Sequence, residues 1–191
     1  MPGPGRCTRS GDSRYHHLTG GKPMKLSDLT AAELDHAANA VHEAAHAVMA
    51  VLAGADVLSC VASGADGRVE FHGHDPERAA GIGWAGPYAE LLFLHRGQPS
   101  EAAVREAFAA ASDEDRDLMG RRAARHVEAD VRFAMPAIRR LAVKLHRTGT
   151  VRSPDIHLAL GVRPGVDIDT VRWAHKQRID PFAIRPAGAA A

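Results

Sequence analysis

A run of helix-forming residues from Ala31 to Ala53, free of proline and glycine, dominates the first third of this chain. Thr30 and Glu33 stand at its start with the spacing of a capping box. Gly54 follows as a stop signal. Apolar residues recur along the run at steps of three and four, as one buried helix face requires. The run therefore predicts a long amphipathic helix.

This predicted helix contains an H-E-x-x-H motif, His42-Glu43-Ala44-Ala45-His46. Residues four apart lie on one helix face, so both imidazoles can reach the same metal ion. Glu43 lies one residue round the helix, where a carboxylate can act as general base on a metal-bound water without binding the metal. The opposing interpretation, a solvated polar face, would expose His46 just where the sequence becomes strongly apolar. The motif favours a catalytic zinc site.

The residues alone leave the third protein ligand open. His72 and His74 follow a predicted hairpin strand and have the character of loop-tip residues. Glu90 lies in a second predicted helix. Asp113 and Asp115 lie in the first turn of another helix, where carboxylates commonly serve only as partners of the helix dipole.

Three segments in order resemble the proteolytic domain of the FtsH-type zinc metalloproteases: VHEAAHAVMAVLAGADV, AGPYAELLF and a Ser-Asp pair that opens a long helix. The resemblance covers residues 30–145 and implies a zincin-like fold, a Zn²⁺ cofactor and metalloendopeptidase activity. It implies that His42 and His46 bind zinc and that Glu43 is the catalytic base. It also favours Asp113 as the third ligand, with Asp115 as the close alternative.

The same resemblance gives Glu90 a role in orienting a zinc ligand or in helix packing. The chain also departs from the family. Ala45 stands where the family has a glycine, and the sequence contains no Walker A motif. We therefore expect a stand-alone relative of the peptidase domain, without the AAA ATPase module.

The elements expected around the motif define an α+β protein that is mostly α. Beta-branched segments at 56–62 and 67–71 flank turn residues and predict a small hairpin. A second helix is expected over 79–95, with Pro87 as the alternative start. Further helices are expected at 100–109, at 113–134 and then, beyond an interruption at Pro136, to about His146. Two short helices are expected from Ser153 and over 168–178.

Composition divides the chain into three parts. Residues 1–25 are rich in Gly, Pro, Ser and Arg and are expected to form a disordered N-terminal tail. The metallopeptidase domain is expected to span 26–162, and residues 163–191 a C-terminal helix and flexible tail. The true start site is either Met1 or Met24.

Charge and cysteine content exclude several classes of protein. The formal net charge is +1, and the basic pairs are mixed with acidic residues, so no nucleic-acid partner is expected. Two cysteines exclude a disulfide scaffold and a cysteine-based zinc finger. No apolar run approaches the ~20 residues of a membrane span, and we expect a cytoplasmic protein.

The predicted partner is a peptide or an unfolded protein, which could add as a strand to the segment GRVEF. Assembly with further copies of the chain or with a separate unfoldase is left open. The alternative function is a non-catalytic zinc-binding module, regulatory or interacting, in which the metal only holds helices together.

Overall fold

The structure is a computed structural model that describes residues 29–64, 66–120 and 127–185. In chain order its elements are α1 (Ala31–Leu52), β1 (Asp56–Ser63), β2 (Asp66–His72), η2 (Pro76–Arg78), α2 (Ala79–His95), α3 (Glu101–Ala110), α4 (Asp113–Met119), α5 (Glu128–Thr148), β3 (Thr150–Val151), α6 (Ser153–Leu160), α7 (Ile168–Lys176) and η4 (Pro181–Ala183). The expected class, α+β and mostly helical with a small sheet, is confirmed. The predicted tail at 1–25 and residues 186–191 lie outside the described residues.

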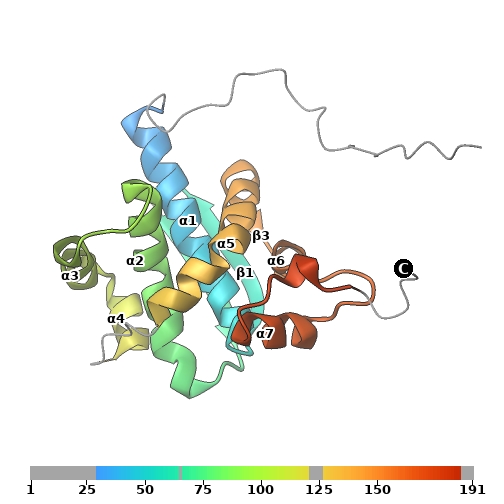
Figure 1. Cartoon of the computed structure of the whole chain (residues 1–191). Helices are drawn as coiled ribbons and strands as arrows, with labels where there is room; N and C mark the ends of the chain where they lie inside the picture. The colour runs from blue at the N-terminus through green and yellow to red at the C-terminus, as the bar shows by residue number, and fades with distance from the viewer. Residues whose placement is uncertain (1–28, 65, 121–126, 186–191) are drawn as a thin grey trace, which may run out of the picture.

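Helix α1 is the central element of the fold and lies between α2 and α5 (Figure 1). Its start has the predicted capping box, with the Thr30 hydroxyl accepting from the Glu33 amide and the Glu33 carboxylate accepting from the Thr30 amide. Nearly every residue from Ala40 onwards is buried, so the helix is covered on all sides and not along one stripe. This explains its many alanines, which let neighbouring elements approach closely.

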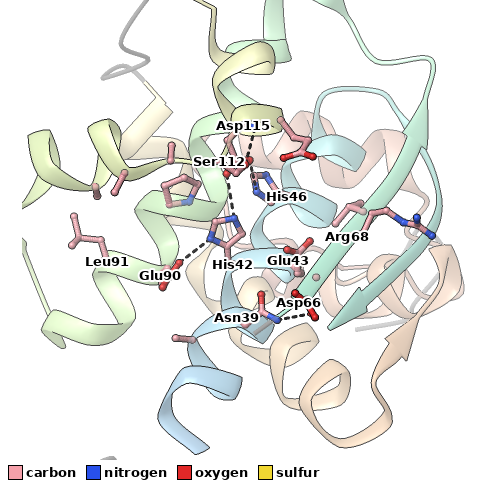
Figure 2. A pocket seen from close by; sticks show the side chains of 18 of the residues that line it. Asn39, His42, Glu43, His46, Asp66, Arg68, Glu90, Leu91, Ser112 and Asp115 are labelled. Carbon is pink, nitrogen blue, oxygen red and sulfur yellow. Dashed lines mark hydrogen bonds and ion pairs between the residues drawn. The ribbon is translucent and has the colours of Figure 1, made fainter. Parts of the chain in front are cut away.

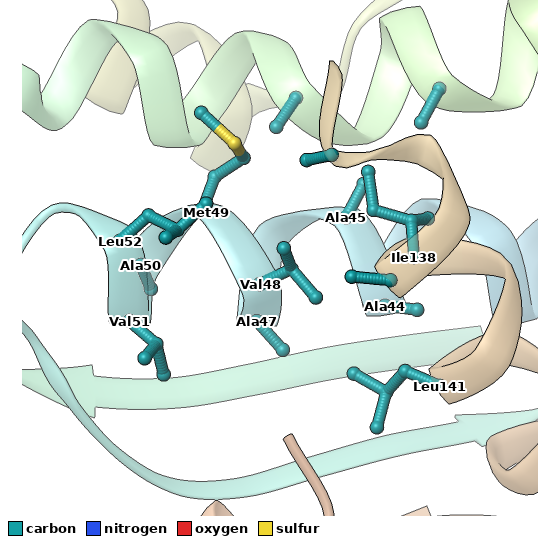
Figure 3. Close-up of a cluster of buried hydrophobic side chains, with 14 of the residues drawn as sticks. Ala44, Ala45, Ala47, Val48, Met49, Ala50, Val51, Leu52, Ile138 and Leu141 are labelled. Atoms are coloured by element: carbon teal, nitrogen blue, oxygen red, sulfur yellow. The ribbon is translucent and has the colours of Figure 1, made fainter. Parts of the chain in front are cut away.

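The core forms where α1 meets α2, α5 and the sheet. In Figure 3, Met49 points to α2, Val51 points to the strands, and Ile138 of α5 reaches α1 near its alanines. All of these side chains are largely or fully excluded from solvent. The core therefore fixes α1, which carries the H-E-x-x-H motif, against three different elements.

The sheet has three antiparallel strands in the order β2-β1-β3. The hairpin of β1 and β2 agrees with the prediction, and a bulge between Val57 and Ser59 shifts its register. The third strand is short and pairs Val151 with Cys60, which no sequence pattern indicated. Because β1 is central, β2 lies at the edge of the sheet.

The predicted helix over 113–134 is wrong, because α4 ends at Met119 and Gly120 follows with a positive φ of 61°. The predicted interruption at Pro136 is wrong as well. Helix α5 continues through Pro136, which lies on the exposed face of the helix. Burial of the opposite face of α5 against α1 stabilises the continuous helix.

Within the described ranges, none of the helices has the length and apolar character needed to cross a membrane.

Candidate metal centre

The two histidines of the motif lie on the side of α1 that faces α2 and α4. Their ring centroids are 4.7 Å apart, in an edge-to-face arrangement. His46 is buried and His42 is mostly buried. The one-turn spacing in the sequence therefore places both rings at a single point, as expected from helical periodicity.

The carboxylate of Asp115 faces both imidazoles (Figure 2). Its Oδ1 lies 3.0 Å from His46 Nε2, and its Oδ2 lies 3.5 Å from His42 Nε2. Helix α4 begins beside it, where the Ser112 hydroxyl accepts a hydrogen bond of 3.0 Å from the Asp115 amide. This N-cap fixes the first turn of α4 and so the direction of the carboxylate.

Asp113, the residue favoured in the sequence analysis, does not join this group. Its side chain is 90% exposed and pairs with Arg116, whereas that of Asp115 is 7% exposed. Both lie in the first turn of α4, but only one face of that turn packs towards α2. The structure therefore brings Asp115, the alternative, and not Asp113, to the two histidines.

The other candidates lie elsewhere or act indirectly. His72 is exposed at the end of β2, and His74 packs edge-on against Phe71, so neither reaches the group. Glu90 accepts a hydrogen bond of 2.8 Å from His42 Nδ1, a contact through which a carboxylate can orient the ring.

Both imidazoles are oriented through their Nδ1 atoms. His42 Nδ1 faces a carboxylate oxygen of Glu90, and His46 Nδ1 lies 2.8 Å from the carbonyl oxygen of Ile82. Both oxygens can only accept a hydrogen bond. Each Nδ1 therefore carries the hydrogen, and each Nε2 turns its lone pair towards Asp115 when the ring is neutral. Histidines that bind metals have such partners on their other nitrogen.

Two glycines of α2 allow the helices to meet this closely. A Cβ on Gly86 would lie 2.2 Å from His46 Nε2 and 2.6 Å from His42 Nε2. A Cβ on Gly83 would lie 2.7 Å from the Asp115 carbonyl oxygen. The sequence analysis did not identify either residue, although glycines inside a helical pattern are a signal of close packing.

Glu43 lies on the other side of the site, between α1 and β2. It is 7% exposed, and a Cβ on Gly67 of β2 would lie 2.4 Å from its Cγ and Oε1. Its carboxylate is directed away from the Nε2 atoms of the histidines and lines the same cleft (Figure 2). The cleft has a volume of about 900 Å³ and is bounded by α1, β2, α2, α3 and α4.

Burial and charge shift the protonation of these groups. Burial by itself lowers the pKa of the His42 imidazole, but hydrogen bonds to Asp115 and Glu90 outweigh it and raise this pKa to about 9. Burial by itself raises the pKa of the Asp115 carboxyl, but hydrogen bonds to His42 and His46 hold it well below its usual range. Burial raises the pKa of Glu43, against the opposing charges of the two imidazoles.

The donor set fits a zinc ion. When His42 and His46 are neutral, their Nε2 atoms can only accept hydrogen bonds, as can the carboxylate oxygens of Asp115. Contact between two such atoms is favourable only when a proton or a cation lies between them. One ligand atom from each of the three residues can be chosen so that all lie within 4.8 Å of one another. Two imidazole nitrogens and one carboxylate oxygen are a set that zinc accepts, and the cleft leaves room for a further ligand.

None of the protein families, curated proteins and solved structures compared with the chain matches it. The interpretation of the site therefore depends on its own geometry and chemistry.

Proposed function

We propose that this protein is a zinc-dependent metallopeptidase with a zincin-like site, related to the proteolytic domain of the FtsH-type proteases. The observation that carries the proposal is the meeting of His42, His46 and Asp115, whose ligand atoms lie within 4.8 Å of one another. Beside them Glu43 lines an open cleft with no part in the cluster itself. Three ligands, one free carboxylate and access for substrate are what a hydrolytic zinc site requires.

The residues have distinct roles in this mechanism. His42, His46 and Asp115 would hold the ion, which would supply Lewis acidity to the scissile carbonyl and to a water molecule. Glu43 accepts a proton from the attacking water and later donates it to the leaving amine. Burial raises the pKa of Glu43, which makes its carboxylate a stronger base than a fully solvated one.

Strand β2 supports the choice of an extended peptide as substrate. It is at the edge of the sheet, and Gly67, Arg68, Val69 and Phe71 line the cleft. A peptide that pairs with this edge through its main chain would pass the metal ligands and Glu43, and such pairing tolerates many side chains. An unfolded protein offers this conformation, whereas a folded one does not.

The test combines metal content with the substitution Glu43→Gln. The parent protein is expected to hold about one zinc ion per chain and to cleave an unfolded casein-like protein. Glu43→Gln keeps the size of the side chain but removes the base, so it should retain zinc and lose at least about a hundredfold in cleavage rate. Glu101→Gln, at an exposed position of α3, is the matched control and should cleave normally.

Two results would reject the proposal. Equal cleavage by the parent and Glu43→Gln would assign the activity to a contaminant or to another mechanism. Stoichiometric zinc in a parent that cleaves no unfolded chain would favour a non-catalytic zinc module, in which the metal contributes only to folding.

A further inference from the structure

Glu43 of α1 and Gly67 of β2 approach each other closely near the site. A Cβ added to Gly67 would lie 2.4 Å from Glu43 Cγ, 2.4 Å from its Oε1 and 2.5 Å from its Cδ. These distances are far inside van der Waals contact. The space between the strand and the Glu43 side chain therefore admits a glycine hydrogen but not a methyl group.

Packing, and not hydrogen bonding, fixes the Glu43 side chain. Its carboxylate makes no hydrogen bond or ion pair with any residue that the structure describes, although three other polar groups of the centre do. It is nevertheless buried, with one side against β2. The backbone of β2 at Gly67 is therefore the wall against which the carboxylate is held.

This wall is itself anchored to α1, one turn before Glu43. The Asn39 side-chain amide donates hydrogen bonds to the carbonyl oxygens of Gly64, at 3.1 Å, and of Asp66, at 2.9 Å. Asn39 and Asp66 are linked in this way at the lower end of the cleft in Figure 2. On its other side, Gly67 is paired with Ala62 of β1. The strand is thus held at two places and cannot easily retreat from α1.

We infer that Gly67 is a positioning residue for the general base, and that Asn39 keeps Gly67 in place. The inference rests on the proposed function, because it gives Glu43 the role of base. If a methyl group were present at position 67, the Glu43 arm, and not the anchored strand, would move. The printed contacts of His42 and His46 are with α2 and α4 and not with β2, so the two histidines would keep them.

The test is the substitution Gly67→Ala, with Gly97→Ala as the matched control. Neither glycine has a positive φ, and a Cβ on Gly97 would meet nothing within 4 Å. Gly67→Ala should keep its zinc and its thermal unfolding temperature, since the displaced atoms belong to a flexible side chain. We expect kcat on an unfolded substrate to fall about tenfold to a hundredfold, the scale of a misplaced catalytic group, with little change in KM.

A second measurement does not depend on turnover. A peptide hydroxamate that chelates zinc passes its hydroxyl proton to a neighbouring carboxylate, so its affinity reports the position of that carboxylate. We expect Gly67→Ala and Glu43→Gln to weaken hydroxamate binding to a similar degree, and Gly97→Ala to leave it unchanged. If the parent binds zinc and the hydroxamate but cleaves nothing, the proposed function fails while this measurement still tests Gly67.

Asn39→Ala removes the side chain that holds β2 close to α1. Without its amide the strand can shift away from α1, so kcat should fall while zinc is retained. In the double variant the strand can make room for the methyl group, and the added effect of Gly67→Ala should be smaller than in the parent background. If Gly67→Ala does not fold, Asn39→Ala alone carries the test.

Unchanged kcat and hydroxamate affinity in both single variants would overturn the inference. Loss of zinc from a folded Gly67→Ala protein would overturn it as well, because the methyl group would then disturb the ligands and not the base.

Discussion

The two sides of the cleft hold their functional groups in different ways. On the helical side, where α1, α2 and α4 meet, each imidazole is fixed by a hydrogen bond that its Nδ1 donates, and both face Asp115. On the side of β2, Glu43 is held by the close approach of Gly67. A metal ligand must keep one direction, whereas a general base must exchange its proton partners during turnover. Hydrogen bonds suit the first requirement, and a steric wall suits the second.

Because the two histidines and Asp115 all lie on the helical side, substitutions there should change metal affinity. The largest effect should come from the proposed ligands themselves. Asp115→Ala should weaken zinc binding by more than the ~10–100-fold that loss of an outer partner costs. Asp113→Ala is the matched control, because that side chain is exposed and pairs with Arg116. Titration against a competing chelator measures both, with His42→Ala/His46→Ala as the reference for complete loss. A larger effect at Asp113 would return the third ligand to the residue favoured from sequence.

A second substitution tests whether the helical side depends on close packing. Gly86→Ala would place a methyl group against the Nε2 atoms of both histidines, so zinc affinity should fall by at least about tenfold. Alanine favours helix over glycine by about 0.5–1 kcal/mol, which offsets part of any loss in the free energy of unfolding. The readouts are zinc titration and thermal unfolding, with Gly97→Ala as control. Normal zinc affinity would mean that α2 can retreat without disturbing the site.

A further prediction concerns the proton that zinc would displace on the helical side. Because the pKa of His42 is raised to about 9, its imidazole carries a proton near pH 7.5 and loses it when zinc binds. Zinc affinity should therefore rise by about tenfold per pH unit below pH 9 and level off above it, as expected for one displaced proton. Calorimetry in buffers of different ionisation enthalpy measures the released proton directly.

Glu90→Gln sharpens this measurement. The Glu90 carboxylate helps to raise the pKa of His42, so its removal should lower that pKa and reduce proton release near neutral pH. Glu77→Gln, at an exposed position of η2, should leave the release unchanged. Identical proton release in the parent and Glu90→Gln would mean that this hydrogen bond does not stabilise the protonated ring.

The local sequence determined the elements that carry the site. The capping box at Thr30, the spacing of His42 and His46, and the turn residues between the strands act over a few residues, so their outcome could be predicted. The same short-range rules predicted α2 and its end at His95, but left its start open between Ala79 and Pro87. They misjudged Pro136, because the burial of α5 against α1 comes from residues distant in sequence.

Only the tertiary structure decided which groups meet at the site. Asp113 and Asp115 both lie in the first turn of α4, where the helix dipole favours either carboxylate equally. They differ in burial, because only the face that carries Asp115 packs on α2. The contacts of Gly86 with the histidines and of Gly67 with Glu43 join elements whose approach no local pattern encodes. The spacing of two residues fixes how their side chains point from one helix. Which carboxylate meets the histidines, and how much room Glu43 has, depend on how separate elements pack.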